Sequence, residues 1–168
     1  RLRSGKLYKT DWIKLNKIIK IFSKLPLFID DTSNLSIYEI RSRIKTINSR
    51  YQKIGLVIID YLQLMQNIQS KNENRVQELS QITRSLKNLA NDFNIPVIAL
   101  SQLSRNIEVR NDKKPVLSDL RESGSIEQDA DLVLMLYQNN SNLGNDITLN
   151  SIKLINLIIA KQRNGPTG

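Results

Sequence analysis

Three runs of consecutive aliphatic residues, separated by helical segments, restrict the fold of this chain more than any other feature. The runs lie at 27–31, 56–64 and 96–103, and helical apolar spacings lie at 11–24, 36–51 and 76–93. The runs are continuous in Val, Ile and Leu, which is typical of strands buried on both faces of a parallel sheet. Helix and strand in alternation therefore predict an α/β fold with a mostly parallel sheet flanked by helices.

The ends of the helices carry local signals. Asp11 is a candidate N-cap of the first helix, and Ser36 with Glu39 has the spacing of a capping box at the start of the second. Asn94 follows the third helix and predicts its end. Two further strands are expected at 132–137 and 152–162, with a turn between them at 139–146. Two loops are expected at 66–75 and 104–125.

The composition limits the chemistry that this fold can carry. The chain has 168 residues, the size of one domain, with no histidine and no cysteine. Catalysis would therefore use carboxylates, Lys, Arg, amides or a metal held by oxygen ligands. The net charge of +9 favours polyanions such as nucleic acid or nucleotide phosphates. A genome biased towards Lys, Asn and Ile codons would give the same charge.

Polar side chains lie at or near the ends of four of the expected strands. They are Asp30 and Asp31, Asp60, Ser101 and Gln102, and Lys161 and Arg163. Because ligands of open parallel sheets lie beyond the carboxyl ends of the strands, we expect these groups to converge.

Each of these groups has a functional and a structural interpretation. Asp60, directly after an aliphatic run, matches a Walker-B carboxylate that holds nucleotide-bound Mg²⁺, or it simply ends a buried strand at a turn. Gln102 could donate to a γ-phosphate or orient a water, or it could cap a strand end. Lys161 and Arg163 are two residues apart, which places both on one face where they suit phosphate oxygens. An ordinary solvated strand end would look the same.

The segment 104–125 is long, basic and free of aromatic residues. Long loops in compact domains are commonly functional. Basic side chains with Ser, Gly124 and backbone N–H groups suit a nucleic-acid backbone rather than stacked bases. A solvated surface loop is the structural alternative. The basic residues are Arg105, Arg110, Lys113, Lys114 and Arg121.

Longer stretches resemble the C-terminal motor domain of the DnaB-type hexameric replicative DNA helicases. The stretches are IIDYLQLM (58–65), the run from NIPVIALSQLSR to SGSIEQDADLVLMLY (94–137), and IIAKQRNGPTG (158–168). The resemblance implies a RecA-like P-loop NTPase core, a homohexamer, and nucleotide sites between neighbouring subunits. It also implies use of ATP and Mg²⁺, translocation on single-stranded DNA, and primase and helicase-loader partners.

The resemblance assigns roles position by position. Asp60 corresponds to the Walker-B acid and Gln102 to the γ-phosphate sensor. Lys161 and Arg163 correspond to the basic pair that reaches a neighbour's nucleotide, with Arg163 as the arginine finger. The channel loops that hold DNA correspond to Arg105 with Arg110, and to Arg121, Glu122 and Gly124.

The sequence also departs from the family pattern. The phosphate-binding G-x-x-x-x-G-K-[ST] loop does not occur, and only Gly5 and Lys6 stand together near the start. Gln138 and Gln162 occupy positions where the family usually has Arg and His. We therefore expect residues 1–168 to be a partial C-terminal RecA-like ATPase domain that exposes apolar surface and does not hydrolyse ATP alone.

Two functional interpretations remain open. The first is a replicative helicase of a plastid or of the bacterial cytoplasm. The second is a non-catalytic protein that binds DNA or associates with a helicase ring. The stretch RESGSIEQDAD (121–131) argues against a RecA-like recombinase or clock-type ATPase. No apolar run approaches the roughly 18 residues of a membrane-spanning helix, so no membrane partner is expected.

Overall fold

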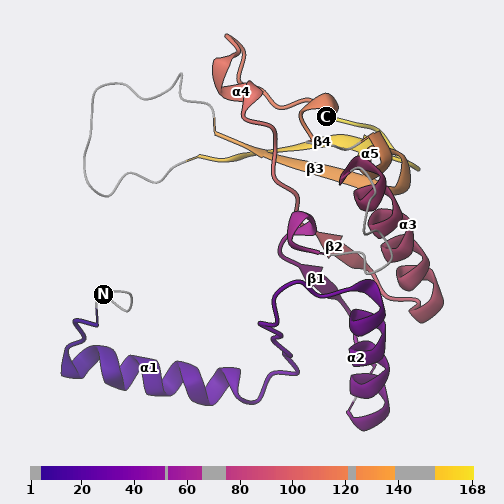
Figure 1. Ribbon diagram of the computed structural model, residues 1–168. Helices are drawn as coiled ribbons and strands as arrows, with labels where there is room; N and C mark the ends of the chain where they lie inside the picture. The colour runs from indigo at the N-terminus through magenta and orange to yellow at the C-terminus, as the bar shows by residue number, and fades with distance from the viewer. Residues whose placement is uncertain (1–4, 52, 66–74, 121–123, 139–153) are drawn as a thin grey trace, which may run out of the picture. The chain divides into compact units, whose positions relative to one another are not determined.

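The computed structural model describes residues 5–51, 53–65, 75–120, 124–138 and 154–168 (Figure 1). The chain divides into two compact units, Arg1–Thr32 and Ser33–Gly168. Within the described residues, no helix is long and apolar enough to cross a membrane.

The first unit contains one long helix, α1 (Lys9–Phe22). The backbone N–H of Tyr8, the residue before the helix, donates to Asp11 Oδ2 at 3.1 Å. Asp11 therefore caps the helix from its third position, and the predicted N-cap is three residues too late. The predicted apolar face is present, but Trp12 and Phe22 are each more than half exposed.

The strand predicted at 27–31 is wrong, because this segment has no regular structure. A strand is stabilised by hydrogen bonds to a neighbouring strand, and the described residues of the first unit contain no other strand. Asp30 Oδ1 instead accepts the Thr32 N–H at 3.1 Å. Asp30 and Asp31 therefore do not stand at the end of a sheet strand.

The second unit begins with α2 (Ile37–Arg50), and its predicted capping box is confirmed. The Ser36 N–H donates to Glu39 Oε2 at 2.8 Å, and the Glu39 N–H donates to Ser36 Oγ at 3.4 Å. Hydrogen bonds from the Ser36 hydroxyl and N–H lower the pKa of Glu39 below its usual value.

Two short strands, β1 (Val57–Ile59) and β2 (Val97–Ala99), form the expected parallel pair. The structure ends β1 just before Asp60, whereas the sequence predicts a strand over 56–64. The Leu62 N–H donates to Leu100 O at 2.9 Å, and the chain then forms a 3-10 turn, η1 (Leu62–Leu64). The turn buries Leu62, which explains an apolar residue in this position without a strand.

The helix α3 (Arg75–Phe93) supplies much of the core of this unit. Leu79, Ile82 and Leu86 pack in one buried cluster with η1 and β3, and Leu89 packs in a second cluster with Ile44 of α2. Asn94 ends the helix with a positive φ of 51°, as predicted. Asn tolerates this left-handed conformation better than most residues.

The segment predicted as a loop at 104–125 contains three short turns of helix. They are α4 (Asn106–Val109), η2 (Leu117–Asp119) and the start of α5 (Gly124–Asp129). A single antiparallel bridge joins Leu103 to Leu120. This bridge holds the two ends of the segment together.

The last two strands, β3 (Leu132–Tyr137) and β4 (Asn156–Gln162), pair antiparallel. The limits of β3 agree with the prediction. Residues 154 and 155, predicted to be in the last strand, lie outside β4, and residues 152 and 153 lie outside the described residues. The predicted turn at 139–146 also lies outside them.

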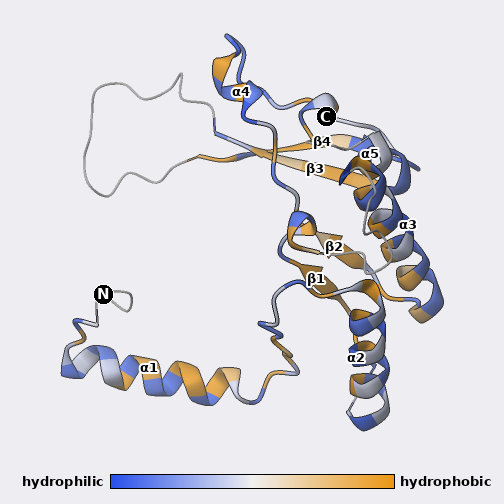
Figure 2. Cartoon of the chain, viewed as in Figure 1, coloured by the Kyte–Doolittle hydropathy of each residue, from blue (hydrophilic) through white to orange (hydrophobic). Residues whose placement is uncertain are grey.

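Both strand pairs leave an apolar face uncovered in this chain (Figure 2). Ile58 is 61% exposed, and Leu134 and Leu136 on β3 are 50% and 69% exposed. Their alternate neighbours Val133 and Met135 are buried. The expected exposure of apolar surface is therefore present.

Candidate nucleotide and DNA site

The tips of the parallel strands bring Asp60 and Gln102 to the same edge of the fold. Ile59, the residue before Asp60, lies opposite Ala99 of β2. Gln63 joins the two tips: its Nε2 donates to Ser101 Oγ at 3.0 Å, and its Oε1 accepts the Gln102 N–H at 3.4 Å. Asp60 and Gln102 are both exposed. Asp60 and Gln102 were predicted to lie at the ends of neighbouring strands, and in the structure they do.

Asp60 offers an accessible carboxylate. Within the described part of the chain, it forms no ion pair with a cation of the protein. No group of three or more acidic side chains could hold a metal by itself among the described residues. A single carboxylate nevertheless suits Mg²⁺, since this ion commonly takes one or two protein carboxylates together with phosphate oxygens and water.

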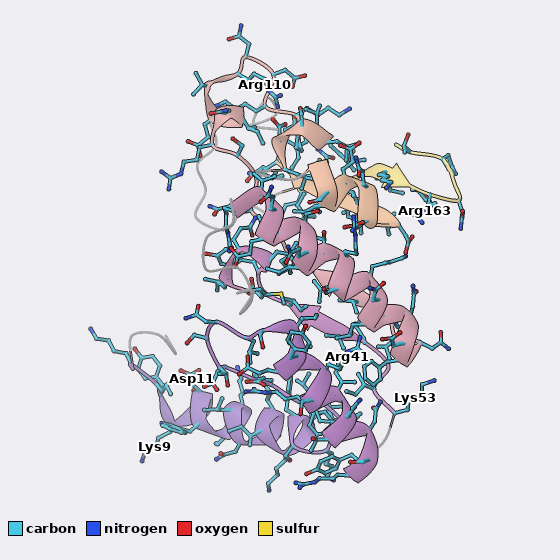
Figure 3. The ribbon with its side chains drawn as sticks, turned by 45° about the vertical axis from the view of Figure 1, so that its right-hand side comes forward. Lys9, Asp11, Arg41, Lys53, Arg110 and Arg163 are labelled. Carbon is cyan, nitrogen blue, oxygen red and sulfur yellow. The ribbon has the colours of Figure 1, made fainter. Side chains whose placement is uncertain are left out.

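Lys161 and Arg163 lie elsewhere, at the end of β4 and beside the start of β3. Lys161 is opposite Val133, and the pairing shifts by one residue between Val133 and Leu134. This bulge turns Lys161 to the same side of the strand pair as the buried Val133. In Figure 3, Arg163 projects from the end of β4, well apart from Arg110.

Both cations contact the C-terminal end of α5. Lys161 Nζ donates to the carbonyl oxygens of Glu127, Gln128 and Ala130, at 3.3 Å for Gln128 and 2.8 Å for Ala130. Arg163 Nη2 also donates to Gln128 O, at 3.3 Å. The end of a helix presents unpaired carbonyls and a partial negative charge, which attract cations. Both side chains reach the same carbonyl oxygen, that of Gln128, although Arg163 lies beyond the end of β4.

The predicted convergence of four strand ends is wrong. Only β1 and β2 end together, because residues 27–31 form no strand and β4 runs antiparallel to β3. The end of β4 lies near α5, whereas the tips of β1 and β2 lead away towards α4 (Figure 1). Asp60 and Gln102 therefore form one group of side chains, and Lys161 and Arg163 form another.

Arg110 is held by its own segment. Its Nη2 donates to Asp119 Oδ2 at 2.7 Å and to Lys114 O at 3.1 Å, and its Nε donates to Asp112 O at 3.1 Å. Asp119 Oδ2 also accepts the Val116 N–H at 2.8 Å. Arg110 therefore shapes the segment that was predicted to contact DNA, with fewer donors left for a phosphate.

Asp119 is the buried centre of this segment, with 6% of its surface exposed. Burial alone would raise the pKa of Asp119. The hydrogen bond from Val116, together with the hydrogen bond and charge of Arg110, outweighs that effect and lowers the pKa below its usual value. Asp119 and Gln63 are not among the predicted site residues, because each acts through a contact with a residue distant in the sequence, Asp119 with Arg110 and Gln63 with Ser101.

The other predicted DNA-contacting residues are only partly described. Arg105 precedes α4 and is exposed, and Gly124 begins α5 and is also exposed. Arg121 and Glu122 lie outside the described residues. Apart from its chain neighbours and the backbone of its own helix, a Cβ atom at Gly124 would meet no heavy atom of the described residues within 4 Å.

Solved structures identify the class of protein to which this fold belongs. The chain has a TM-score of 0.83 and 40% identity with a solved ATPase domain, over 99% of this chain and 57% of that one. It has the same TM-score and 41% identity with a DnaB-like replicative helicase described with its interactions with primase, over 98% of this chain and 39% of that one. The fold is that of a RecA-like α/β ATPase domain.

The family model of the DnaB-like helicase C-terminal domain matches residues 1–168, and the chain belongs to this family. It is 66% identical to a probable replicative DNA helicase of Trieres chinensis, over 100% of this chain and 37% of that protein. It is 48% identical to the replicative DNA helicase DnaB of Geobacillus stearothermophilus, over 99% of this chain and 36% of that protein. The chain thus spans little more than a third of these relatives.

Proposed function

We propose that this chain is part of an ATP-dependent replicative DNA helicase that translocates on single-stranded DNA as a homohexamer. The observation that carries the proposal is the separation of two groups of polar side chains. Asp60 and Gln102 lie at the tips of β1 and β2, whereas Lys161 and Arg163 lie beside α5. One subunit would therefore complete its nucleotide site with the cations of a neighbour.

In this proposal each group acts on a different part of the nucleotide. Asp60 would hold Mg²⁺, which neutralises charge on the transferred phosphoryl group when bound. Gln102, held by its backbone contact with Gln63, would hydrogen-bond the γ-phosphate or orient the attacking water. Arg163 of a neighbouring subunit would donate its planar guanidinium to the phosphate oxygens, and Lys161 would support it with a second charge.

The segment between β2 and β3 would contact the DNA backbone. Its basic side chains and the backbone N–H groups at the start of α5 suit phosphates, which gives binding without sequence preference. Arg105 and Arg121 would contact DNA directly. Arg110 would instead keep the segment folded through Asp119.

Gly124→Ala tests the DNA contact with little risk to the fold. Among the described residues outside its own helix backbone and chain neighbours, the added methyl meets no atom within 4 Å, so the free energy of unfolding should stay the same or rise by up to about 1 kcal/mol. If a phosphate approaches the backbone here, single-strand affinity should fall roughly tenfold, since a hydrogen bond to a charged group contributes about 1.5–3 kcal/mol. Gly55→Ala, also in open space, is the matched control. Unchanged affinity in fluorescence anisotropy would remove Gly124 from the DNA site.

The shared site is tested by mixing two inactive variants of the full-length protein. Asp60→Asn subunits keep Arg163 but lack the metal-binding carboxylate, and Arg163→Ala subunits keep Asp60. Each variant alone should be inactive. After random reassembly at equal amounts, about a quarter of the subunit interfaces pair an intact Asp60 with an intact Arg163, so ATPase activity should reappear.

Sites built within one subunit would give no recovery at any mixing ratio. Absence of ATPase activity in the unmodified protein would favour the alternative, a non-catalytic protein that binds DNA or associates with a helicase ring. The primase-interacting DnaB-like structure supports primase as a partner. A helicase loader as partner, and a plastid or the bacterial cytoplasm as location, rest on the family and on the codon bias alone.

A further inference from the structure

Asp131 stands between α5 and β3 and has no role in the function proposed above. Its carboxylate Oδ1 lies 3.3 Å from Arg163 Nε, and its carbonyl oxygen accepts the Arg163 N–H at 2.9 Å. Arg163 is thus held through both its main chain and its side chain by one residue. The main-chain contact fixes the position of the backbone at the end of β4, and the side-chain contact fixes the position of the guanidinium Nε.

Asp131 is itself held by α3. Lys87 Nζ forms an ion pair with Asp131 Oδ2, the oxygen that does not face Arg163. One helical turn earlier, Thr83 Oγ1 donates to Asp129 Oδ2 at 2.7 Å. Because residues four apart lie on the same face of a helix, α3 fastens the 129–131 segment at two successive points. The position of Asp131 is therefore set by the helix that supplies the core.

The energetics of the pair favour a role other than stability. The side chains of Arg163 and Asp131 are 50% and 54% exposed, and exposed ion pairs contribute little to folding. The hydrogen bond and charge of Lys87, with the charges of Arg163 and Lys161, lower the pKa of Asp131 despite the opposing effect of partial burial. The carboxylate stays ionised at neutral pH. Within the described residues, Arg163 Nη1 makes no hydrogen bond, so part of the guanidinium remains available.

We infer that Asp131 is the positioning residue for Arg163: it holds Nε and leaves the terminal nitrogen Nη1 of the guanidinium free to meet a phosphate on a neighbouring subunit. The inference rests on the proposed function, since it assumes that Arg163 acts at that phosphate. Asp131 itself does not touch the nucleotide. Lys87 sets the orientation of the carboxylate.

The test uses mixed assemblies of the full-length protein, in which the same substitution is placed on one or the other of the two kinds of variant subunit. In a mixture of Asp60→Asn and Arg163→Ala subunits, only the Asp60→Asn subunits supply a working arginine. Asp131→Asn on those subunits should lower the restored kcat roughly tenfold to hundredfold with little change in KM, because small displacements of a catalytic group have effects of this size. Asp131→Asn on the Arg163→Ala subunits should change nothing.

Two further variants separate positioning from folding. Asp129→Asn also removes one negative charge from this segment, but Asp129 contacts Thr83 and not Arg163. It should have little effect on either kind of subunit. Asp131→Glu keeps the charge and should recover part of the activity. If Asp131→Asn lowers kcat equally on either kind of subunit, its role is structural and the inference is overturned. If it lowers kcat on neither kind, the inference is also overturned. If the parent mixture has no ATPase activity, the proposed function fails first, and the positioning role fails with it.

Discussion

Arg163→Ala in the full-length protein is expected to lower ATP hydrolysis about a thousandfold or more, because an arginine finger contributes roughly 10³–10⁵ to the rate of phosphoryl transfer. The guanidinium donates to oxygens whose charge increases in the transition state, so the loss should fall on kcat. Steady-state ATPase assays with single-stranded DNA measure it. Arg163→Lys keeps a charge without the planar fork and should recover only part of the rate.

Mixtures of Arg163→Ala and wild-type subunits give the second part of this result. Each Arg163→Ala subunit inactivates one neighbouring site, so activity should fall at least in proportion to the fraction of variant subunits, and faster where an inactive site slows its neighbours. Arg84→Ala is the matched control, since Arg84 is an exposed arginine on α3. A loss of activity smaller than the fraction of variant subunits would contradict the finger role of Arg163.

Leu89→Ala is expected to lower the free energy of unfolding by about 2–5 kcal/mol, the range for a buried leucine whose cavity does not close. Leu89 has no exposed surface and packs against Ile44 of α2 and Ile95 before β2. The substitution therefore removes a buried contact that joins α3 to both elements. Since domains are stable by only about 5–15 kcal/mol, this loss is large.

Urea denaturation of the 168-residue chain, followed by far-ultraviolet circular dichroism, measures this effect. The midpoint should fall while the slope stays constant, since the surface exposed on unfolding changes little. Leu64→Ala is the control, because Leu64 in η1 is 49% exposed. It should cost about 1 kcal/mol or less. Equal effects of the two substitutions would mean that the second core cluster contributes little to stability.

The helices were the most predictable part of the second unit. For α2 the signal is a side chain that hydrogen-bonds backbone groups within one turn, as Ser36 and Glu39 do. For α3 it is an apolar stripe repeated over five turns and ended by Asn94. Both signals act between residues close in sequence, so no knowledge of the rest of the chain is needed.

The strands were less predictable because their limits depend on partners. The aliphatic run at 56–64 supports only three residues of β1, since pairing with β2 ends where the chain turns at Asp60. The run at 27–31 also begins with consecutive apolar residues but forms no strand. Composition identifies segments able to form strands, and the hydrogen bonds of a neighbour decide which of them do.

By itself, the sequence determined the family, the α/β class, the main helices of the second unit and the identity of the charged residues, because each of these is carried by local patterns or by motifs. Only the tertiary structure decided which of the polar and charged residues lie near one another. It placed Asp60 beside Gln102 through parallel pairing, and it moved Lys161 and Arg163 away to α5 and Asp131 through antiparallel pairing. The carboxyl end of a strand lies at one edge of a sheet or at the opposite edge, depending on the direction in which the strand runs. That direction is set by pairing with strands distant in the chain.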